Sequence, residues 1–580
     1  MSSSLAMSAS AQSQSAASHA RLDELLAALK AQATPFARLS VAAKAALLRS
    51  CIDTTQAAAQ AWTEAAVAAK GTSMEVPAAF EEWAGGPVTT VRNVRLLAEM
   101  LEEIARTGQL PLEEGRFSTA PDGATQVRVF PNSLMDKALY AGITAQVRMQ
   151  KGLTPAMVRE RAGAFYKKRD PEGGVSLVLG AGNVASIAPM DALYKLFVDG
   201  SVCLVKMNPV NEYLEPHYIR AFQPLVDAGY LAFVRGGGAE GAYLCEHPLV
   251  DDVHITGSDR THDLIVWGPP GSERERRKRA HDPVLKKPIS SELGCVTPVV
   301  VVPATFSDSE LQFVAENVAS MVTNNASCNC NAGKMLVTSA GWPQRADFLA
   351  RVRAVLAVQK PRKAYYPGAF DRWTALTTGH PQAEKLGEVR EGDLPWTLIF
   401  GLDAADHDES LFVTEPFCPI LSETSLPERD PAKFLAAATT FCNDRLWGTL
   451  SAVVMIHPKT EAAPGVSAAL DRALAELRYG AVGINVWTGL VYGLVTPPWG
   501  AHPSSTPEDI QGGLGWVHNT FMLEGIEKCV LRAPLTASPK PPWFVTHQNA
   551  HRVGEKLVGN EAHPSWLNLP GIVLAVLKAG

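Results

Sequence analysis

The sequence predicts an α/β fold with parallel, doubly wound sheets, and three observations support this. Apolar runs of strand length alternate with helical stretches from Gly174 to Gly257, and a second alternating region runs from Glu292 to about Pro498. Repeated strand–helix units are typical of parallel sheets that carry helices on both faces. The chain has 580 residues, which is too long for one hydrophobic core, so two or three domains are expected.

The sequence of the N-terminal part predicts a tail, a helical region and a strand-like arm. Residues 1–19 are mostly Ser, Ala, Gln and Met without the apolar centre of a signal peptide, so we expect a disordered tail. From Ala20 to about Arg106, apolar residues recur at three- and four-residue spacing, which predicts helices. Residues 112–150 contain two short strand-like runs, Gln126–Val129 and Leu139–Ala141, broken by Pro and Gly.

In the first alternating region, four apolar runs predict strands: Val175–Leu179, Val202–Lys206, Leu231–Val234 and Val253–Thr256. Helical stretches separate the runs, and one of them covers Glu215–Ala228. Doubly wound sheets bind ligands at the carboxyl ends of their strands, which is where we expect a ligand.

In the second region the strand candidates are Val299–Val302, Lys334–Val337, Trp396–Phe400 and Ala452–Ile456. Between the two regions, residues 269–287 are highly charged and predict a solvated surface loop. Near the end, Pro534–Trp543 predicts a linker or extended arm. Pro564–Gly580 contains a short apolar helix, which we expect to pack on the body or on a partner subunit.

The composition excludes several classes of protein. A net charge of -6 and a pI near 6.2 give no reason to expect a nucleic-acid partner. No apolar run reaches the length of a membrane span. Nine cysteines at irregular spacing are not a disulfide framework and suit the reducing cytoplasm. Cys328-Asn329-Cys330 lacks a second Cys/His pair at ligand spacing, so no metal site is expected.

Two segments carry the residues that covalent catalysis needs. Ser291-Glu292-Leu293-Gly294 offers a carboxylate beside a glycine, and residues 324–332 read Asn-Asn-Ala-Ser-Cys-Asn-Cys-Asn-Ala. A general base with a thiol nucleophile is what covalent oxidation or acyl transfer requires.

This pair of segments resembles the Glu-Leu-Gly and Asn-x-x-x-x-Cys motifs of the aldehyde dehydrogenase superfamily. Other segments resemble further motifs of that family, in the family's order, between about Val175 and Leu535. They are Gly182-Asn183, Lys206 at a strand end, Gly241, His247-Pro248, Ile255-Thr256-Gly257-Ser258, Asn325 with Cys330, Glu415-Pro416-Phe417-Cys418-Pro419, Gly483-Ile484-Asn485 and Pro498-Trp499-Gly500.

The resemblance implies an aldehyde dehydrogenase-like fold. It has two doubly wound α/β domains, one binding the cofactor and one catalytic, and a small oligomerisation element. After the tail at 1–19, we expect the cofactor-binding domain at 20–290, with the strand-like arm near 112–150. The catalytic domain follows at 291–500, and a C-terminal return or oligomerisation segment with an extension at 501–580. A cytoplasmic homodimer or homotetramer is implied.

The resemblance also implies a mechanism for oxidising an aldehyde to the acid. Cys330 attacks the aldehyde, and the Asn183 amide with the Cys330 backbone N–H stabilises the oxyanion of the thiohemiacetal. Glu292 then activates the water that releases the acid from the thioester. Cys328 is the rival nucleophile, but the spacing from Asn325 favours Cys330.

NADP or NAD is the implied cofactor. By the resemblance, Glu415 and Phe417 hold the nicotinamide ribose and ring, and Lys206 contacts the adenosine ribose. The diphosphate is assigned to Gly257 and Ser258. Gly241 and Leu293 belong to motifs that complete the cofactor site.

Four positions depart from the family pattern: Ala185, Pro209, His262 and Cys295. His262 stands where a glycine closes the diphosphate turn, so the packing of the cofactor must differ. Pro209 stands where NAD-preferring members often carry a Glu on the adenosine ribose. Without that carboxylate a 2′-phosphate is not repelled, and we expect NADP to serve at least as well as NAD.

Two other functions stay open. Gly182-Asn183-Val184, the run Ile265-Val266-Trp267-Gly268 and the divergent cysteine segment also resemble the fatty acyl-CoA reductase branch. That branch takes an acyl-CoA and forms an aldehyde. The second alternative is a catalytically inactive scaffold that binds nucleotide or a partner. The intact pair of Glu292 and Cys330 argues against it.

Overall fold

The computed structural model describes residues 2–577, with side chains from His19 onward. Its N-terminal part is helical, as the sequence predicted, and consists of α1 (Ser2–Arg38), α2 (Val41–Ala69), α3 (Ala79–Trp83) and α4 (Thr89–Thr107). Leu22, Leu26 and Leu29 bury one face of α1, and the side chain of Ser40 caps α2. Helix α1 includes residues 2–18, where a disordered tail was expected. Because the side chains of that stretch are not described, the tail stays a prediction.

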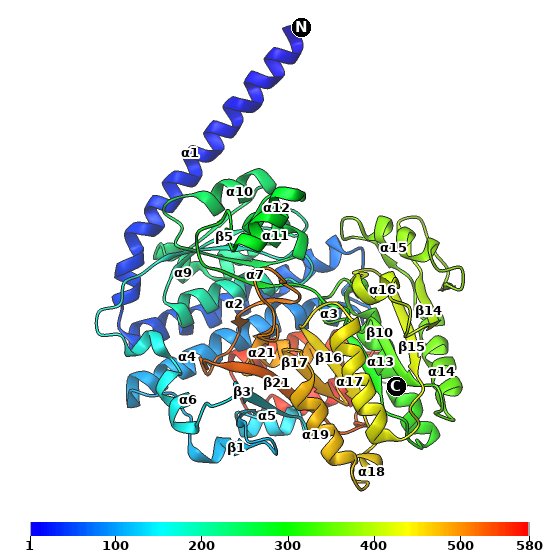
Figure 1. The fold of residues 1–580 in the computed structure, drawn as a ribbon. Helices are drawn as coiled ribbons and strands as arrows, with labels where there is room; N and C mark the ends of the chain where they lie inside the picture. The colour runs from blue at the N-terminus through cyan, green and yellow to red at the C-terminus, as the bar shows by residue number, and fades with distance from the viewer. Residues whose placement is uncertain (1, 578–580) are drawn as a thin grey trace.

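Five parallel strands form the first doubly wound sheet: β4 (Val175–Leu179), β5 (Val202–Lys206), β6 (Leu231–Val234), β7 (Asp252–Thr256) and β8 (Ile289–Glu292). Their order is β6-β5-β4-β7-β8, and the short β19 (Gly513–Leu514) pairs antiparallel with β8. Helices α7 (Ile187–Tyr194), α10 (Gly238–Glu246) and α11 (Asp259–Trp267) belong to this region, with α10 and α11 in the upper half of Figure 1, below the end of α1. The chain order reverses between β4 and β7, which is the switch point at which such sheets bind ligands.

The second sheet has eleven strands, and their order across the sheet is β1 (Phe117–Thr119), β2 (Thr125–Phe130), β3 (Thr144–Met149), β21 (Ile526–Arg532), β17 (Ala481–Ile484), β16 (Ser451–Met455), β9 (Pro298–Val301), β10 (Met335–Ser339), β15 (Ile420–Leu426), β14 (Trp396–Leu402) and β12 (Glu384–Leu386). The strands from β21 to β14 are parallel. The arm β1–β3 joins this sheet because β3 pairs antiparallel with β21. The domain boundaries expected from the sequence stay a prediction.

Helices cover both faces of the second sheet, on the right of Figure 1. Alternate residues of β9 point to opposite faces. Val299 packs with α13 (Asp308–Thr323) and α14 (Arg345–Ala357). Val300 packs with α17 (Pro431–Arg445) and α19 (Val466–Glu476). The predicted doubly wound α/β architecture is therefore present in both sheets.

Three local predictions were wrong. Leu139–Ala141 is not a strand, because it ends α5 (Leu134–Leu139), which a capping box at Ser133 begins. The charged stretch 269–287 is not a loop throughout, since it contains α12 (Ser272–Ala280), where Glu273 pairs with basic residues one turn on. The helix expected over Glu215–Ala228 is split into α8 (Glu215–Ala221) and α9 (Gln223–Asp227), whose first turn contains Pro224.

The C-terminal segment returns to the N-terminal helices. After β21 the chain has no helix or strand until η7 (Ala550–Arg552), followed by α21 (Gly554–Ala562) and α22 (Leu569–Leu577). Within the described residues this agrees with the expected linker, and α22 confirms the short apolar helix. Glu561 of α21 forms ion pairs with Arg92 (2.9 Å) and Arg95 (2.6 Å) of α4. Arg92 also pairs with Asp136 at 2.8 Å. This buried cluster anchors α21 to α4.

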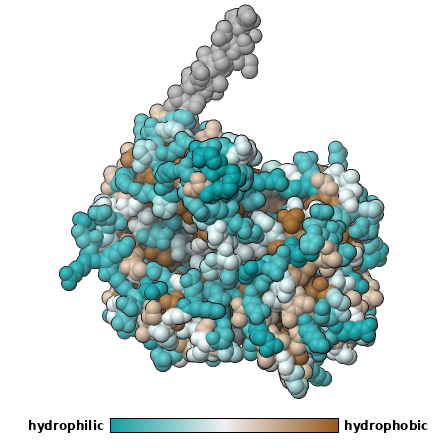
Figure 2. Space-filling view, viewed as in Figure 1, coloured by the Kyte–Doolittle hydropathy of each residue, from teal (hydrophilic) through white to brown (hydrophobic). Residues whose placement is uncertain are grey.

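The face shown in Figure 2 is mostly hydrophilic, with hydrophobic residues scattered over it. Among the helices of residues 2–577, none combines the length and the hydropathy that a bilayer crossing requires.

We expect Glu561→Ala to lower the free energy of unfolding by about 3–5 kcal/mol, because it leaves two buried guanidinium groups without their shared carboxylate. Chemical denaturation measures this directly. The control is Glu99→Ala, which removes a partly exposed partner of Arg95 and should cost less than about 1 kcal/mol. Equal effects of the two substitutions would contradict an anchoring role for Glu561.

Candidate active site

Cys330 lies in a loop with an unusual backbone. Helix α13 ends at Thr323, and Asn325, Ala326 and Ser327 follow with φ values of 52°, 53° and 62°. Left-handed values cost about 1–3 kcal/mol for each residue other than glycine. The loop therefore depends on contacts that hold it in place before the chain enters β10.

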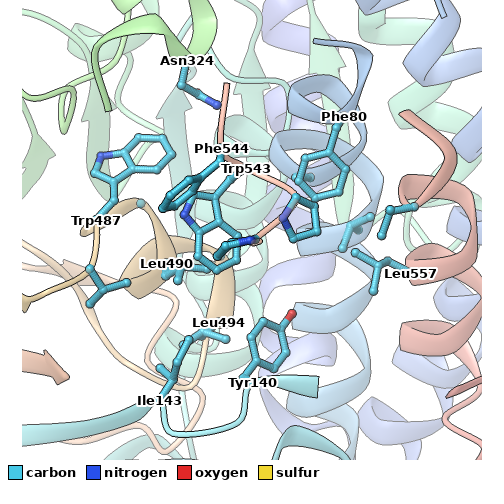
Figure 3. Close-up of a pocket in the computed structure, with 18 of the residues that line it drawn as sticks. Phe80, Tyr140, Ile143, Asn324, Trp487, Leu490, Leu494, Trp543, Phe544 and Leu557 are labelled. Atoms are coloured by element: carbon cyan, nitrogen blue, oxygen red, sulfur yellow. The ribbon is translucent and has the colours of Figure 1, made fainter. Parts of the chain in front are cut away.

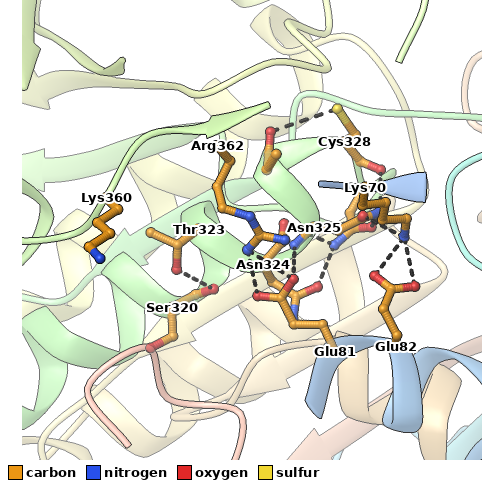
Figure 4. Close-up of polar contacts among 12 residues, drawn as sticks. Lys70, Glu81, Glu82, Ser320, Thr323, Asn324, Asn325, Cys328, Lys360 and Arg362 are labelled. Carbon is orange, nitrogen blue, oxygen red and sulfur yellow. Dashed lines mark hydrogen bonds and ion pairs between the residues drawn. The ribbon is translucent and has the colours of Figure 1, made fainter. Parts of the chain in front are cut away.

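Lys70, at the end of α2, supplies the central contact. Its ammonium group donates to the Glu82 carboxylate (2.8 Å), the Asn183 carbonyl (3.0 Å) and the Asn325 side-chain oxygen (2.8 Å). Figure 4 shows Lys70 between Glu82 and Asn325. An ammonium group has three N–H donors, so these partners use all of them. The cysteine loop is thereby tied to the helical layer and to the turn after β4.

Side-chain amide groups make further hydrogen bonds to the cysteine loop. The Asn325 side chain donates to the carbonyls of Asn183 (3.0 Å) and Cys328 (3.1 Å), and Tyr365 donates its hydroxyl to Asn325 (2.9 Å). The Asn183 side chain donates to the Cys328 carbonyl at 3.0 Å. An amide has two donors, so Asn183 keeps a second N–H for another acceptor near the cysteine loop.

Glu81 holds the start of the same loop. Its carboxylate accepts from the backbone N–H of Asn325 (2.9 Å) and pairs with Arg362 at 3.3 Å (Figure 4). Burial raises the pKa of Glu81, and the charge of Arg362 opposes that shift. The loop is thus held at Asn325 from the backbone and from the side chain.

Glu292, the last residue of β8, lies beside Cys330. Burial raises the pKa of Glu292 to about 8, and the charges of Asp191 and Glu415 act in the same direction. Burial, together with the charges of Glu292 and Glu415, also raises the pKa of the Cys330 thiol well above its usual value. As the pH rises, the Glu292 carboxyl group ionises before the Cys330 thiol. Glu292 is therefore suited to accept protons near pH 8.

The two cysteines of the loop differ in access. Cys330 is partly exposed, whereas the other eight cysteines are buried. Cys330 lines a cavity of about 400 Å³. The Cys328 sulfur lies 3.7 Å from the carbonyls of Ala326 and Phe417, and burial raises its pKa to about 11. A molecule in the cavity can therefore reach Cys330 and not Cys328.

Glu415 and Phe417 lie near the thiol and the Glu292 carboxyl. A Cβ at Gly294 would overlap the Glu415 carboxylate, so only glycine leaves room for it. Burial raises the pKa of Glu415 to about 7, and its buried Oε1 has no hydrogen-bond partner within residues 2–577. The Lys334 ammonium lies 5.8 Å from the centre of the Phe417 ring. An unpaired buried oxygen suits the hydroxyl of a ligand.

The remaining predicted cofactor residues gather at the carboxyl edge of the first sheet. Lys206 ends β5, Leu293 follows β8, and Gly257 with Ser258 follows β7 and caps α11. No hydrogen bond or ion pair is made by the Lys206 ammonium among the described side chains. A free cation and a helix N-terminus both suit phosphate groups. Gly241 lies in the first turns of α10, where a Cβ would meet no atom within 4 Å, so no close approach explains the glycine.

Lys70, Glu82 and Tyr365 were not among the site residues predicted from the sequence. Single polar residues in helical or loop stretches form no local pattern, and their partners lie far away in the chain. The one available signal was the pair Glu81-Glu82 between the apolar residues Phe80 and Trp83, since adjacent carboxylates in an apolar setting need partners.

Comparison with known proteins supports the family suggested by these motifs. Residues 133–365 match the model of the aldehyde dehydrogenase family. Aminoacetaldehyde dehydrogenase of Pseudomonas aeruginosa is 31% identical over 237 residues, 38% of this chain and 44% of that protein. The 4-trimethylaminobutyraldehyde dehydrogenase of Oryzias latipes is 26% identical over 261 residues, 43% of this chain and 45% of that protein. The chain thus spans less than half the length of these two curated relatives.

The likeness of the fold extends further than the likeness of the sequence. A solved NAD-dependent aldehyde dehydrogenase from Sinorhizobium meliloti superposes with a TM-score of 0.54 at 20% identity, over 90% of this chain and 88% of that one. This confirms the predicted fold class. Residues 133–365 thus resemble the aldehyde dehydrogenase family, and the chain has the fold of solved aldehyde dehydrogenases.

Proposed function

We propose that this protein oxidises an aldehyde to the carboxylic acid with NADP or NAD, through a covalent intermediate on Cys330. One observation carries the proposal: a partly exposed thiol at a cavity wall lies beside a buried carboxyl group, Glu292, whose pKa of about 8 suits a general base. The family domain and the fold agree with this chemistry.

In this mechanism, the Cys330 thiol gives its proton to solvent water, and the thiolate sulfur adds to the aldehyde carbon, which forms a thiohemiacetal. The free N–H of Asn183 and the backbone N–H of Cys330 stabilise the oxyanion, and Lys70 with Asn325 positions Asn183. A bound nicotinamide nucleotide supplies the hydride acceptor. Oxidation leaves a thioester on Cys330. Glu292 then takes a proton from water, whose oxygen attacks the thioester and releases the acid.

The carboxyl edge of the first sheet fits the nucleotide. Lys206, whose ammonium group has no partner among the side chains that the structure describes, suits the adenosine ribose or its 2′-phosphate. Gly257 and Ser258, at the N-terminus of α11, suit the diphosphate. The Glu415 oxygen that lacks a partner within the described part of the chain suits a hydroxyl of the nicotinamide ribose, and Phe417 would flank the ring.

An acyl-CoA reductase stays the alternative function, since it uses the same thioester on Cys330 in the reverse direction. The position of Glu292 beside Cys330 favours water as the acceptor of the acyl group and therefore favours the acid as product. Assays with and without CoA separate the two reactions. An inactive scaffold has less support, because it needs neither an accessible thiol nor a neighbouring base.

We also propose a cytoplasmic location and a homodimeric or homotetrameric state. The nine cysteines are all unpaired, which suits a reducing compartment. The assembly rests on the family resemblance, and size-exclusion chromatography with light scattering tests it.

We expect Cys330→Ala to abolish aldehyde oxidation while nucleotide binding persists, because the substitution removes only the nucleophile. The matched control is Cys328→Ala, which should keep substantial activity, since that sulfur is buried against backbone carbonyls. Steady-state kinetics and calorimetric titration with the nucleotide measure the two properties. The reverse pattern would assign the nucleophile to Cys328.

We expect turnover to rise from about pH 7 to about pH 9, because the raised pKa keeps Glu292 protonated, and inactive as a base, below about pH 8. Glu292→Gln should remove this rise and slow turnover about a hundredfold or more. It should still give a stoichiometric burst of reduced cofactor, because the Cys330 thioester forms and is then hydrolysed slowly. Stopped-flow absorbance resolves burst and turnover. If the Glu292→Gln variant lost both the burst and the turnover, Glu292 would have a role besides activating water.

We expect NADP to be used at least as well as NAD, and Pro209→Glu to shift the preference toward NAD. Pro209 is exposed in the turn after β5 and carries no charge to repel a 2′-phosphate. A charge-assisted contact contributes roughly 1.5–3 kcal/mol, so the shift should be about tenfold or more. The kcat/KM values for both cofactors test this. A wild type strongly selective for NAD would instead assign the ribose to Glu212, whose charge already acts on Lys206.

A further inference from the structure

The cavity beside Cys330 has a polar wall near the thiol and an apolar wall elsewhere. Near the thiol it is lined by the polar side chains of Asn325 and Asn329. Elsewhere aromatic and aliphatic side chains line it, among them Phe80, Trp487, Leu490, Leu494, Trp543 and Leu557 (Figure 3). Trp487 donates to the Asn331 carbonyl at 2.7 Å, which places it beside the cysteine loop. In Figure 3, Leu557 lies on the opposite side of the cavity from Trp487.

The charged side chains in the cavity wall are neutralised by partners. The pairs are Lys70 with Glu82 (2.8 Å), Glu81 with Arg362 (3.3 Å) and Lys540 with Glu316 (2.7 Å). A carboxylate that is already paired holds a second cation poorly, because the first partner must be displaced inside a poorly solvated site. Among the residues that the structure describes, the wall therefore has no free carboxylate for an ammonium group.

The C-terminal segment forms much of the apolar wall and is held firmly. The Val545 N–H donates to the Ser320 hydroxyl (2.9 Å), and the Thr546 hydroxyl donates to Glu316 (2.8 Å), both on α13. The Phe544 ring packs on Phe313 with centroids 4.8 Å apart. Since α21 is also anchored to α4 through Glu561, the apolar wall exists before a ligand binds.

We propose that this cavity binds the hydrocarbon tail of a neutral aldehyde, with the carbonyl group at Cys330 and the tail against the C-terminal segment. The inference rests on the proposed function for the carbonyl end, while the tail site rests on the cavity alone. A cavity of about 400 Å³ encloses a small organic molecule. Polar groups at one end and apolar side chains over the rest match an unbranched aldehyde better than a short or cationic one.

Kinetics with straight-chain aldehydes from propanal to decanal test the proposal on the full-length protein. Each buried methylene should raise kcat/KM about fourfold until the cavity is filled. Aminoacetaldehyde should be a poorer substrate than propanal. A flat chain-length profile, or a preference for the cationic aldehyde, would overturn the proposal while leaving aldehyde oxidation intact.

Leu557→Asn tests the far wall of the cavity. It should lower the ratio of kcat/KM for decanal to that for propanal about tenfold, and the ratio is independent of the folded fraction of the sample. The matched control is Leu574→Asn, because Leu574 of α22 is 57% exposed and does not line the cavity. The control should leave the ratio unchanged. A similar drop in both variants would contradict a specific tail site.

Calorimetric titration with octan-2-one, a ketone that the proposed reaction does not oxidise, tests the tail site without turnover. We expect binding to the wild type, weaker binding of butan-2-one, and weaker octan-2-one binding to the Leu557→Asn variant. If no aldehyde is oxidised but this pattern holds, the proposed function fails and the apolar site stands. Equal affinities for the two ketones would overturn the site itself.

Discussion

The ammonium group of Lys70 is the contact on which the geometry around Cys330 depends. A buried charge is stable only when it is paired and fully hydrogen-bonded, and Glu82 supplies the opposite charge. The other two N–H groups hold Asn183 and Asn325. One cation therefore holds both the loop that carries the thiol and Asn183, whose side-chain amide donates to that loop. The strained left-handed residues after α13 persist because leaving these groups unpaired would cost more than the strain.

The nucleophile and the base come from different sheets. Cys330 precedes β10 of the eleven-stranded sheet, and Glu292 ends β8 of the six-stranded sheet. Glu292 is held through its backbone, since its carbonyl accepts from the Gly257 N–H at 3.1 Å and β19 pairs on its other side. The carboxyl group interacts with Cys330, Asp191, Glu415 and Trp499, and its burial raises its pKa. The contacts that bring the two groups together therefore also raise the pH at which the carboxyl group can act as a base to about 8.

The segments outside the recognisable motifs decide what can approach the thiol. Helix α3 contributes Phe80 to the cavity, and the C-terminal segment contributes Trp543 and Leu557. The buried cluster of Arg92, Arg95 and Glu561 joins the C-terminal segment to α4, the α-helix that follows α3 along the chain. Substrate preference can thus change through residues far in sequence from Cys330, while the reacting groups stay the same.

By itself, the sequence determined the fold class and much of the strand arrangement. Val175–Leu179 and Val202–Lys206 are β4 and β5 with the expected bounds, because strands buried on both faces are typically near-continuous apolar runs. The motifs also identified Asn183, Glu292 and Cys330, which the structure brings together, although their roles stay predictions.

Only the tertiary structure decided the partners of Lys70, the access of Cys330 compared with Cys328, and the use of the C-terminal segment as a cavity wall. Only the structure shows that part of the charged stretch at 269–287 is a helix. It also shows that a Cβ at Gly241 would meet no neighbouring atom. The spacing of apolar residues along the sequence indicates which face of a helix or strand is buried. The partner of a single buried charge, and the pKa of a carboxyl group, depend instead on which distant segments pack around it.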